Sequence, residues 1–132
     1  MSGEKNLTTL IKEMKPFVNK GEYVFTSVSN TSNIDKEEII SFFKEQEGVT
    51  LILKKSVADN LNLTYSFIAS WITLKIHSAL DAVGLTAAFS TELAKNNISC
   101  NVVAGYYHDH IFVAKKDEAK TIEVLTNLSN SF

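Results

Sequence analysis

The chain has 132 residues, of which 45% are hydrophobic and 21% charged, and its formal net charge is −2. This length allows one good core or two small ones and excludes a large multidomain enzyme. No segment approaches the roughly 18 uncharged apolar residues that span a bilayer, and residues 1–10 lack the apolar core of a secretory signal. We therefore expect a cytoplasmic protein that does not associate with membranes.

The basic residues argue against a nucleic-acid partner. All 13 of them are lysines, whereas the rigid guanidinium fork of arginine is the usual group for gripping phosphate or guanine. They cluster only at Lys54-Lys55 and Lys115-Lys116, which is less than a nucleic-acid surface needs. We expect no nucleic acid to bind.

The single cysteine, Cys100, excludes a disulfide framework and a cysteine-based zinc site. It lies in the apolar alternation of residues 98–104, where a small buried thiol is the expected occupant. No cationic neighbour in sequence would lower its pKa. The pattern indicates a core residue.

The first half predicts a helix, a strand, a second helix, a strand and a short third helix. Residues 7–14 carry an apolar stripe at helical spacing and end before Pro16, which indicates a short docking helix. Residues 22–28 alternate like a strand. Asp35 followed by Glu38 then predicts a helix that runs from Asp35 to about residue 46. A strand is expected over 49–53 and a short polar helix over 56–61.

The second half shows a clearer pattern. Alternation over residues 67–76 predicts a long strand, and the apolar stripe of residues 85–96 predicts an amphipathic helix. Two strands, expected over 98–105 and 111–114, flank the hairpin connection Tyr106-Tyr107-His108-Asp109-His110, and a last helix is expected from Asp117 to about Leu128.

The two halves match at their strand ends, because residues 51–55 and 112–116 both pass from apolar residues into a lysine pair. This weak repeat predicts two related units, residues 1–63 and 64–132, with one extra strand in the second. Strand-helix-strand-strand-helix order indicates an α+β fold of ferredoxin-like type, with helices on one face of mainly antiparallel sheets.

Residues 72–90, 93–94 and 97–113 closely resemble the ACT-type units of small stand-alone bacterial proteins, and residues 3–7 and 21–25 are similar to the N-terminal unit that accompanies them. The resemblance implies tandem βαββαβ units. It also implies a regulatory module that binds an amino acid or another small effector at an interface between units, as similar units in aspartate kinases do, and a homodimer.

The resemblance places the effector at the loop between the first strand and first helix of the second unit, here residues 77–86. Amides of Gly84, Leu85 and Thr86 would lie at a helix N-terminus, which favours an anion such as a carboxylate. Asp81 would take the ammonium group. The ligand-binding prediction comprises Asp81, Ala82, Val83, Gly84, Leu85, Thr86 and Asn101. The alternative is that Gly84 only permits a turn and that Asp81 is solvated or caps the helix.

Histidines and tyrosines form a second group, with His77, Tyr107, His108 and His110 as secondary candidates. These residues could form a three-histidine or a His/His/Asp metal site, but a turn at His108-Asp109 would splay the side chains, so a plain hairpin is favoured. We predict no metal and no cofactor.

The predicted function is that of a non-catalytic sensor or regulator whose partner is a small molecule, in particular an amino acid. His77, Ser78 and Asp81 have the composition of a catalytic triad, yet so short a stretch cannot be assumed to place them in series. The alternative function is a structural or oligomerisation module that uses ACT-type sheets without an effector.

Overall fold

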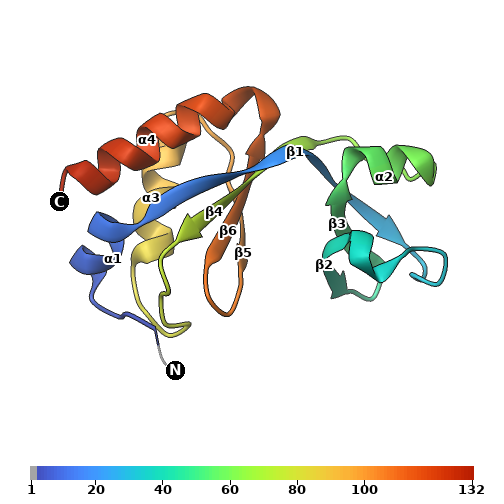
Figure 1. The fold of residues 1–132 in the computed structure, drawn as a ribbon, viewed down its shortest axis with the longest axis horizontal. Coiled ribbons are helices and arrows are strands. Elements are labelled where there is room, and N and C mark those ends of the chain that lie inside the picture. Colours follow the sequence, from blue (N-terminus) through green and yellow to red (C-terminus); the bar gives the residue numbers. More distant parts are fainter. Residues whose placement is uncertain (1–2) are drawn as a thin grey trace. The chain divides into compact units, whose positions relative to one another are not determined.

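The computed structural model describes residues 3–132. Helices and strands alternate along the chain (Figure 1). The elements are α1 (Leu7–Glu13), β1 (Lys15–Val28), the 3₁₀ turn η1 (Lys36–Glu38), β2 (Ile39–Lys44), β3 (Val49–Lys54), α2 (Lys55–Asn60), β4 (Ile68–Lys75), α3 (Leu85–Lys95), β5 (Asn101–Ala104), β6 (Asp109–Ala114), the 3₁₀ turn η2 (Lys115–Asp117) and α4 (Glu118–Asn130).

The chain divides into two compact units. Unit 1 comprises the described residues up to Lys20 together with Ser70–Phe132, and unit 2 comprises Gly21–Ala69. Strand β1 therefore begins in unit 1 and ends in unit 2. The predicted boundary between residues 63 and 64 separates two sequence repeats. The compact units are defined by contacts instead, so that boundary stays a prediction.

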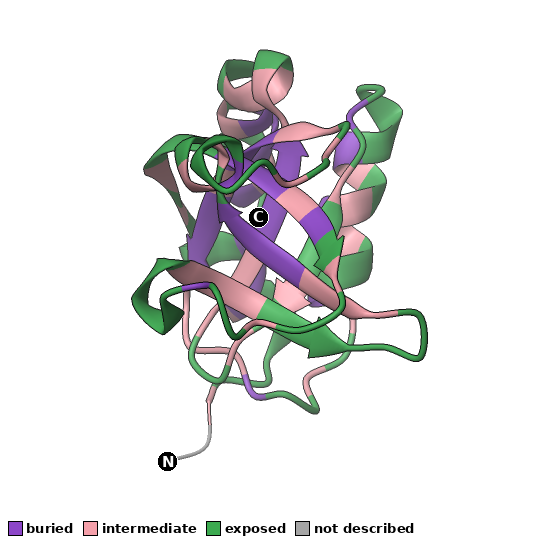
Figure 2. Ribbon diagram, turned by 90° about the vertical axis from the view of Figure 1, so that its right-hand side faces the viewer, coloured by how far each residue is buried: buried purple, intermediate pink, exposed green. Residues whose placement is uncertain are grey.

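Unit 1 places its strands in the order β1-β4-β6-β5, with β5 and β6 antiparallel. Helices α1, α3 and α4 contact one another, and inward side chains of β4 and β6, such as Ile72 and Ile111, join them in one core. The other fully buried members of that core include Leu10, Ile11, Met14, Leu74, Phe89, Leu93, Val113 and Leu125. Buried residues gather on the strands in Figure 2.

Unit 2 is smaller. Its strands run in the order β2-β3-β1, and both pairings are antiparallel. Helix α2 contacts β3, and its Ala58 joins a core whose other buried members are Val24, Ile34, Leu51 and Leu53. Strand β2 is the edge of this arrangement.

The helix predicted from Asp35 to about residue 46 is wrong. Asp35 does cap, since its side chain accepts a hydrogen bond from the Glu37 amide, but only the three residues of η1 follow. Ile39–Lys44 then forms β2 and pairs with β3. Its β-branched and aromatic residues favour a strand, and cross-strand pairing overrides the local helix signal.

The remaining elements appear where the sequence predicted them, with shifted ends. Strand β1 begins at Lys15 rather than residue 22, β5 begins at Asn101 rather than residue 98, and α4 follows a 3₁₀ turn. Because β2 exists, the stretch from β1 to α2 and the stretch from β4 to α4 have the same order: strand, turn or helix, strand, strand, helix. The second half therefore has no extra strand, and the expected ferredoxin-like α+β plan is confirmed for both units.

Candidate functional site

The N-terminal segment fixes the loop that follows β4. Glu4 donates its amide to the His77 carbonyl at 2.8 Å and accepts at its own carbonyl from the Ala79 amide at 2.9 Å. A Cβ at Gly3 would lie 2.6 Å from backbone atoms of residues 77–79, so only glycine permits this approach. The loop is therefore held by backbone bonds rather than by its own side chains.

Asp81 forms an ion pair that the sequence analysis missed. Its Oδ2 lies 3.0 Å from Nζ of Lys5. The hydrogen bond from Lys5 and the charge of that ammonium lower the pKa of Asp81. Both side chains stay largely in water, at 62% and 73% relative exposure for Lys5 and Asp81. A pair so exposed is weakly held.

Helix α3 begins at a bend with an uncapped N-terminus. Gly84 is its N-cap residue with φ of 102°, and no side chain caps the helix. Leu7 lies against Gly84, since a Cβ there would be 3.0 Å from Leu7 Cδ2. Leu85 is buried whereas Thr86 is exposed, and the first amides of a helix have no partner within the helix itself.

The rest of the bend differs in exposure. Val83 is 83% exposed, whereas Ala82 is half-buried and donates its amide to the Ala79 carbonyl at 3.0 Å. Ala82 therefore shapes the turn, and Val83 presents an apolar side chain to solvent.

Three aromatic rings meet beside the loop. The His77 ring centroid lies 6.0 Å from that of Tyr106 and 5.1 Å from that of Tyr107, and the two tyrosines pack edge to face at 5.0 Å. A hollow of about 230 Å³ opens here, lined by Gly3, residues 77–81 and Tyr106. The structure thus brings His77, Asp81 and Tyr107 into one neighbourhood.

The amides proposed as an anion cradle lie in a different place. Gly84, Leu85 and Thr86 do not line this hollow. A ligand that used both features would have to span from the hollow to the first turn of α3.

His108 and His110 do not join His77 in a metal site, and the described residues contain no cluster of three or more metal-binding side chains. His110 belongs to a polar network on β4 and β6. Its Nδ1 accepts a hydrogen bond from Trp71 Nε1 at 3.0 Å and lies 3.0 Å from Thr73 Oγ1, to which Asn19 donates at 2.9 Å. The proton of the neutral ring is therefore on Nε2.

The two hairpin histidines differ in their surroundings. Burial, with a smaller contribution from the neighbouring His108, lowers the pKa of His110, while Asp109 opposes the shift. Burial raises the pKa of the Asp109 carboxyl. Nδ1 of His108 is buried without a hydrogen-bond partner among the described residues. The lowered pKa of His110 favours its neutral imidazole, and its part in a ligand site stays a prediction.

Asn101 lies on β5, where its side-chain amide donates to the Phe112 carbonyl at 3.5 Å. It pairs across the strands with Phe112. The structure thus gives Asn101 a neighbour on β6, and its part in a ligand site stays a prediction.

Cys100 packs against the core of unit 1. Burial raises the pKa of its thiol to about 11, so thiolate, the reactive form, is scarce at neutral pH.

Lys5, Gly3 and Tyr106 are the neighbours that the sequence did not reveal. Lys5 and Asp81 are 76 positions apart, and no periodicity links an N-terminal segment to a loop at that distance. They come together because the backbone of Glu4 pairs with the loop backbone at residues 77–79.

The family models for the ACT domain match residues 2–70 and 66–127. The chain therefore belongs to the ACT domain family, with two ACT-type domains in tandem. ACT domains are ligand-binding regulatory modules, so the class of protein is a regulatory one. The tandem resemblance inferred from the sequence is confirmed.

Among solved structures, a Vibrio cholerae protein of unknown function, described as a possible transport protein, is 43% identical, with a TM-score of 0.84 over 95% of this chain and 97% of that one. Aspartate kinase from Clostridium acetobutylicum is 12% identical, with a TM-score of 0.61 over 89% of this chain and 34% of that one. Aspartokinase III of E. coli, in complex with aspartate and ADP, is 11% identical, with a TM-score of 0.60 over 85% of this chain and 32% of that one.

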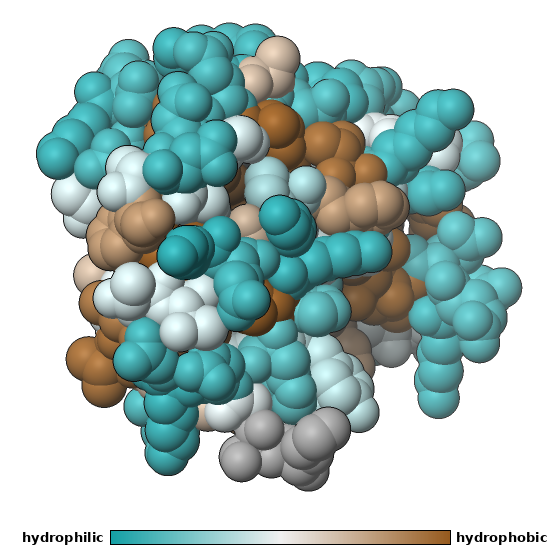
Figure 3. Space-filling view, turned by 60° about the vertical axis from the view of Figure 1, so that its left-hand side comes forward, coloured by the Kyte–Doolittle hydropathy of each residue, from teal (hydrophilic) through white to brown (hydrophobic). Residues whose placement is uncertain are grey.

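A search of curated proteins finds no match. Among residues 3–132 no helix has both the length and the apolar character needed to cross a bilayer. The outer surface viewed in Figure 3 carries mostly hydrophilic residues, with smaller hydrophobic patches between them.

Proposed function

We propose that the chain is a cytoplasmic, non-catalytic regulator that senses a free amino acid beside the loop of residues 77–86. The observation that carries this proposal is the exposed Lys5–Asp81 ion pair at a hollow. An α-amino acid has one ammonium and one carboxylate close together, and a loosely held ammonium–carboxylate pair presents the complementary charges. A distant structural neighbour, aspartokinase III of E. coli, is in complex with aspartate, which is a ligand of the same class.

The parts of the site have distinct tasks in this proposal. The carboxylate of Asp81 takes the ligand ammonium, while Lys5 attracts the ligand carboxylate. His77 and Tyr106 form an aromatic wall for the side chain. Binding would tie the N-terminal segment more firmly to the loop, and this ordering is the change that a partner or a second copy would detect.

A triad of His77, Ser78 and Asp81 is not assembled. The His77 ring contacts Tyr106 and Tyr107, and Asp81 pairs with Lys5. These contacts favour a binding role for the loop over nucleophilic catalysis.

A thermal-shift screen with the twenty amino acids tests the proposal. A ligand that binds only the folded state raises the melting temperature by mass action. Asp81→Asn should abolish the shift, whereas Glu13→Gln, which changes the net charge equally on the exposed side of α1, should retain it. No shift with any amino acid at millimolar concentration would refute the sensor, and an unchanged shift in Asp81→Asn would remove Asp81 from the site.

The second candidate is an assembly module. Edge strand β2 exposes Phe42 at 56% and Phe43 at 70%, and an exposed apolar edge strand is a template for pairing with another chain. A dimer in sedimentation equilibrium that dissociates in Phe43→Ser, together with a negative amino-acid screen, would favour this function over the sensor.

A further inference from the structure

Unit 2 contains a hollow that the fold itself creates. In unit 1 the connection from β4 to β5 contains α3, an 11-residue helix. In unit 2 the equivalent connection from β1 to β2, residues 29–38, is helical only in the three residues of η1. The strand that follows η1 therefore lacks the helical cover that α3 gives to unit 1.

Phe42 shows the consequence. It pairs directly with Leu51, and directly opposed residues of an antiparallel pair share one face of the sheet. Leu51 is fully buried in the core of unit 2, yet Phe42 beside it is 56% exposed. The ring of Phe42 therefore lies on the core side of β2 without a helix over it, and it forms the floor of a hollow that is open to solvent.

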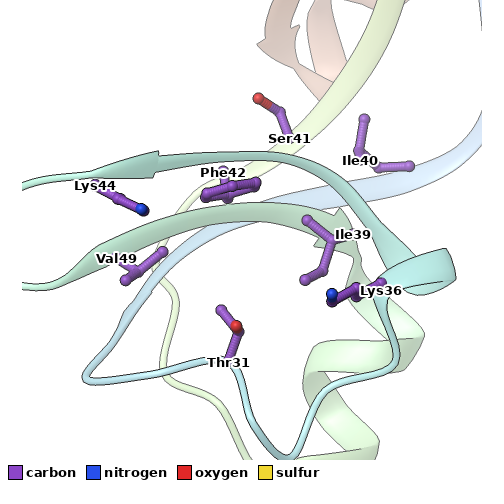
Figure 4. Close-up of a pocket in the computed structure, with 8 residues that line it drawn as sticks. All are labelled: Thr31, Lys36, Ile39, Ile40, Ser41, Phe42, Lys44 and Val49. Carbon is purple, nitrogen blue, oxygen red and sulfur yellow. The ribbon is translucent and has the colours of Figure 1, made fainter.

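The hollow has the size of a small-molecule pocket. Its volume is about 550 Å³, within the roughly 300–1,000 Å³ range of pockets that bind small organic ligands. The apolar lining comes from Ile39, Ile40, Phe42 and Val49, and Thr31 adds a hydroxyl (Figure 4). All of these residues belong to unit 2.

The charged lining has one sign. Lys36 and Lys44 stand at opposite ends of the hollow, and both side chains extend toward it (Figure 4). Neither ammonium has an ion pair among those of the described residues. No Asp or Glu lines the hollow; of the nearby acids, Asp35 caps the Glu37 amide and Glu45 bonds Thr50.

We propose that this hollow binds a small apolar carboxylate, with an alkyl or aromatic body on Phe42 and its carboxylate at Lys36 or Lys44. The apolar floor favours a hydrophobic body, and the two unpaired ammonium groups favour an anionic head. A zwitterionic amino acid suits the hollow poorly because no carboxylate there would take its ammonium. The site is independent of the loop of residues 77–86, so either proposal can fail without the other.

Octanoate titrated into the ¹⁵N-labelled chain tests the proposal, with octanol and octylamine as probes that have the same tail and a neutral or cationic head. Octanoate should shift the amide signals of Ile39, Phe42 and Val49 and should bind more tightly than octanol, while octylamine should bind most weakly. Equal affinity for octanoate and octanol, or shifts confined to other residues, would overturn the proposal.

Variants that remove the charge of Lys36 or Lys44 show where the octanoate carboxylate binds. Lys36→Gln or Lys44→Gln should weaken octanoate by up to about fivefold, the range of a solvent-accessible charge pair, and should leave octanol binding unchanged. Lys54→Gln, an exposed lysine of β3 outside the hollow, is the matched control. An unchanged octanoate affinity in the double variant Lys36→Gln/Lys44→Gln would refute the anionic head.

A variant that fills the hollow, together with a measurement of mass in solution, distinguishes a small ligand from a second copy of the chain. Val49→Phe should abolish octanoate binding while circular dichroism retains the wild-type signal. If octanoate does not bind and sedimentation instead shows a dimer that Val49→Phe dissociates, the hollow accepts a second copy of the chain and the ligand proposal is wrong.

Discussion

The stretch from β1 to α2 and the stretch from β4 to α4 follow the same order of elements, but they differ in how their first two strands are connected. Unit 1 uses α3, whose Phe89 and Leu93 are fully buried, whereas unit 2 uses a 3₁₀ turn without a buried residue. The apolar side chains of α3 fill the core of unit 1. The turn leaves Phe42 of unit 2 half in water. The same order of elements can therefore give a closed core or an open hollow, depending on whether the connection between the first two strands contains a helix that covers the sheet.

The core of unit 1 should be the more sensitive of the two to truncation. Phe89 and Leu51 are both at 0% exposure, in the cores of unit 1 and unit 2 respectively. Phe89→Ala should lower the free energy of unfolding by about 3–5 kcal/mol and Leu51→Ala by about 2–5 kcal/mol, since both remove apolar contacts and leave a cavity. Urea denaturation followed by circular dichroism measures both.

Leu80→Ala is the control, because Leu80 is 68% exposed and such a surface change should stay within about 0.5 kcal/mol. A larger loss in Leu51→Ala than in Phe89→Ala would reverse the comparison between the units.

The bend before α3 should be the next most sensitive feature. Gly84 has φ of 102°, and an added Cβ would lie 3.0 Å from Leu7 Cδ2. Gly84→Ala should therefore cost about 1–3 kcal/mol of unfolding free energy, the usual cost of a non-glycine residue held at positive φ. Thermal unfolding measures the loss. Thr86→Ala, in the exposed first turn of the same helix, should be nearly neutral, and a neutral Gly84→Ala would show that the bend adapts freely.

The helix signal in unit 2 gives a smaller and more specific prediction. Asp35 accepts the Glu37 amide at 3.0 Å, so Asp35→Ala should cost about 0.5–1 kcal/mol as a lost cap. A capping box would also need Glu38, but the helix it would begin is absent. Glu38→Ala should therefore leave the unfolding free energy unchanged in urea denaturation. Equal losses in both variants would indicate a longer helix at this place.

The sequence predicts the elements of unit 1 well because each pattern there is supported by its packing. The stripe of residues 85–96 becomes α3, and the inward residues of the strand over 67–76 become the core. In unit 2 the local signal at Asp35 and the strand preference of Ile39–Lys44 conflict. Pairing with β3 makes Ile39–Lys44 a strand. The local pattern around Asp35 does not reveal this pairing, because β3 begins only at Val49.

The candidate site was less predictable than the fold. The loop of residues 77–86 could be named from a resemblance, and the structure places Tyr107 against His77 of this loop. The ion pair with Lys5 depends on Gly3 lying against the loop backbone. The hollow of unit 2 was unpredictable for a related reason, since it exists only because an expected helix is missing.

The smallest expected effect concerns His110 of unit 1. Unit 2, residues 21–69, contains no histidine. Nδ1 of His110 already accepts from Trp71 Nε1, so protonation there would set two N–H groups against each other. Burial, and then His108, hold the pKa of His110 below its ordinary 6.5. The folded protein thus binds fewer protons than the unfolded chain, and the stability that this histidine contributes above about pH 6.5 is lost as the pH falls through the lowered value.

The fluorescence of Trp71, the single tryptophan, reports this titration, because a protonated imidazole quenches indole emission more strongly than a neutral one. The emission should fall with a midpoint below 6.5, the ordinary histidine pKa, and the unfolding free energy should fall over the same range. His110→Gln should remove the transition, whereas His77→Gln should retain it, since His77 contacts Tyr106 and Tyr107 instead. A midpoint above the ordinary value would mean that the charge of Asp109 outweighs burial, and His110 would then be a cation that unit 1 stabilises.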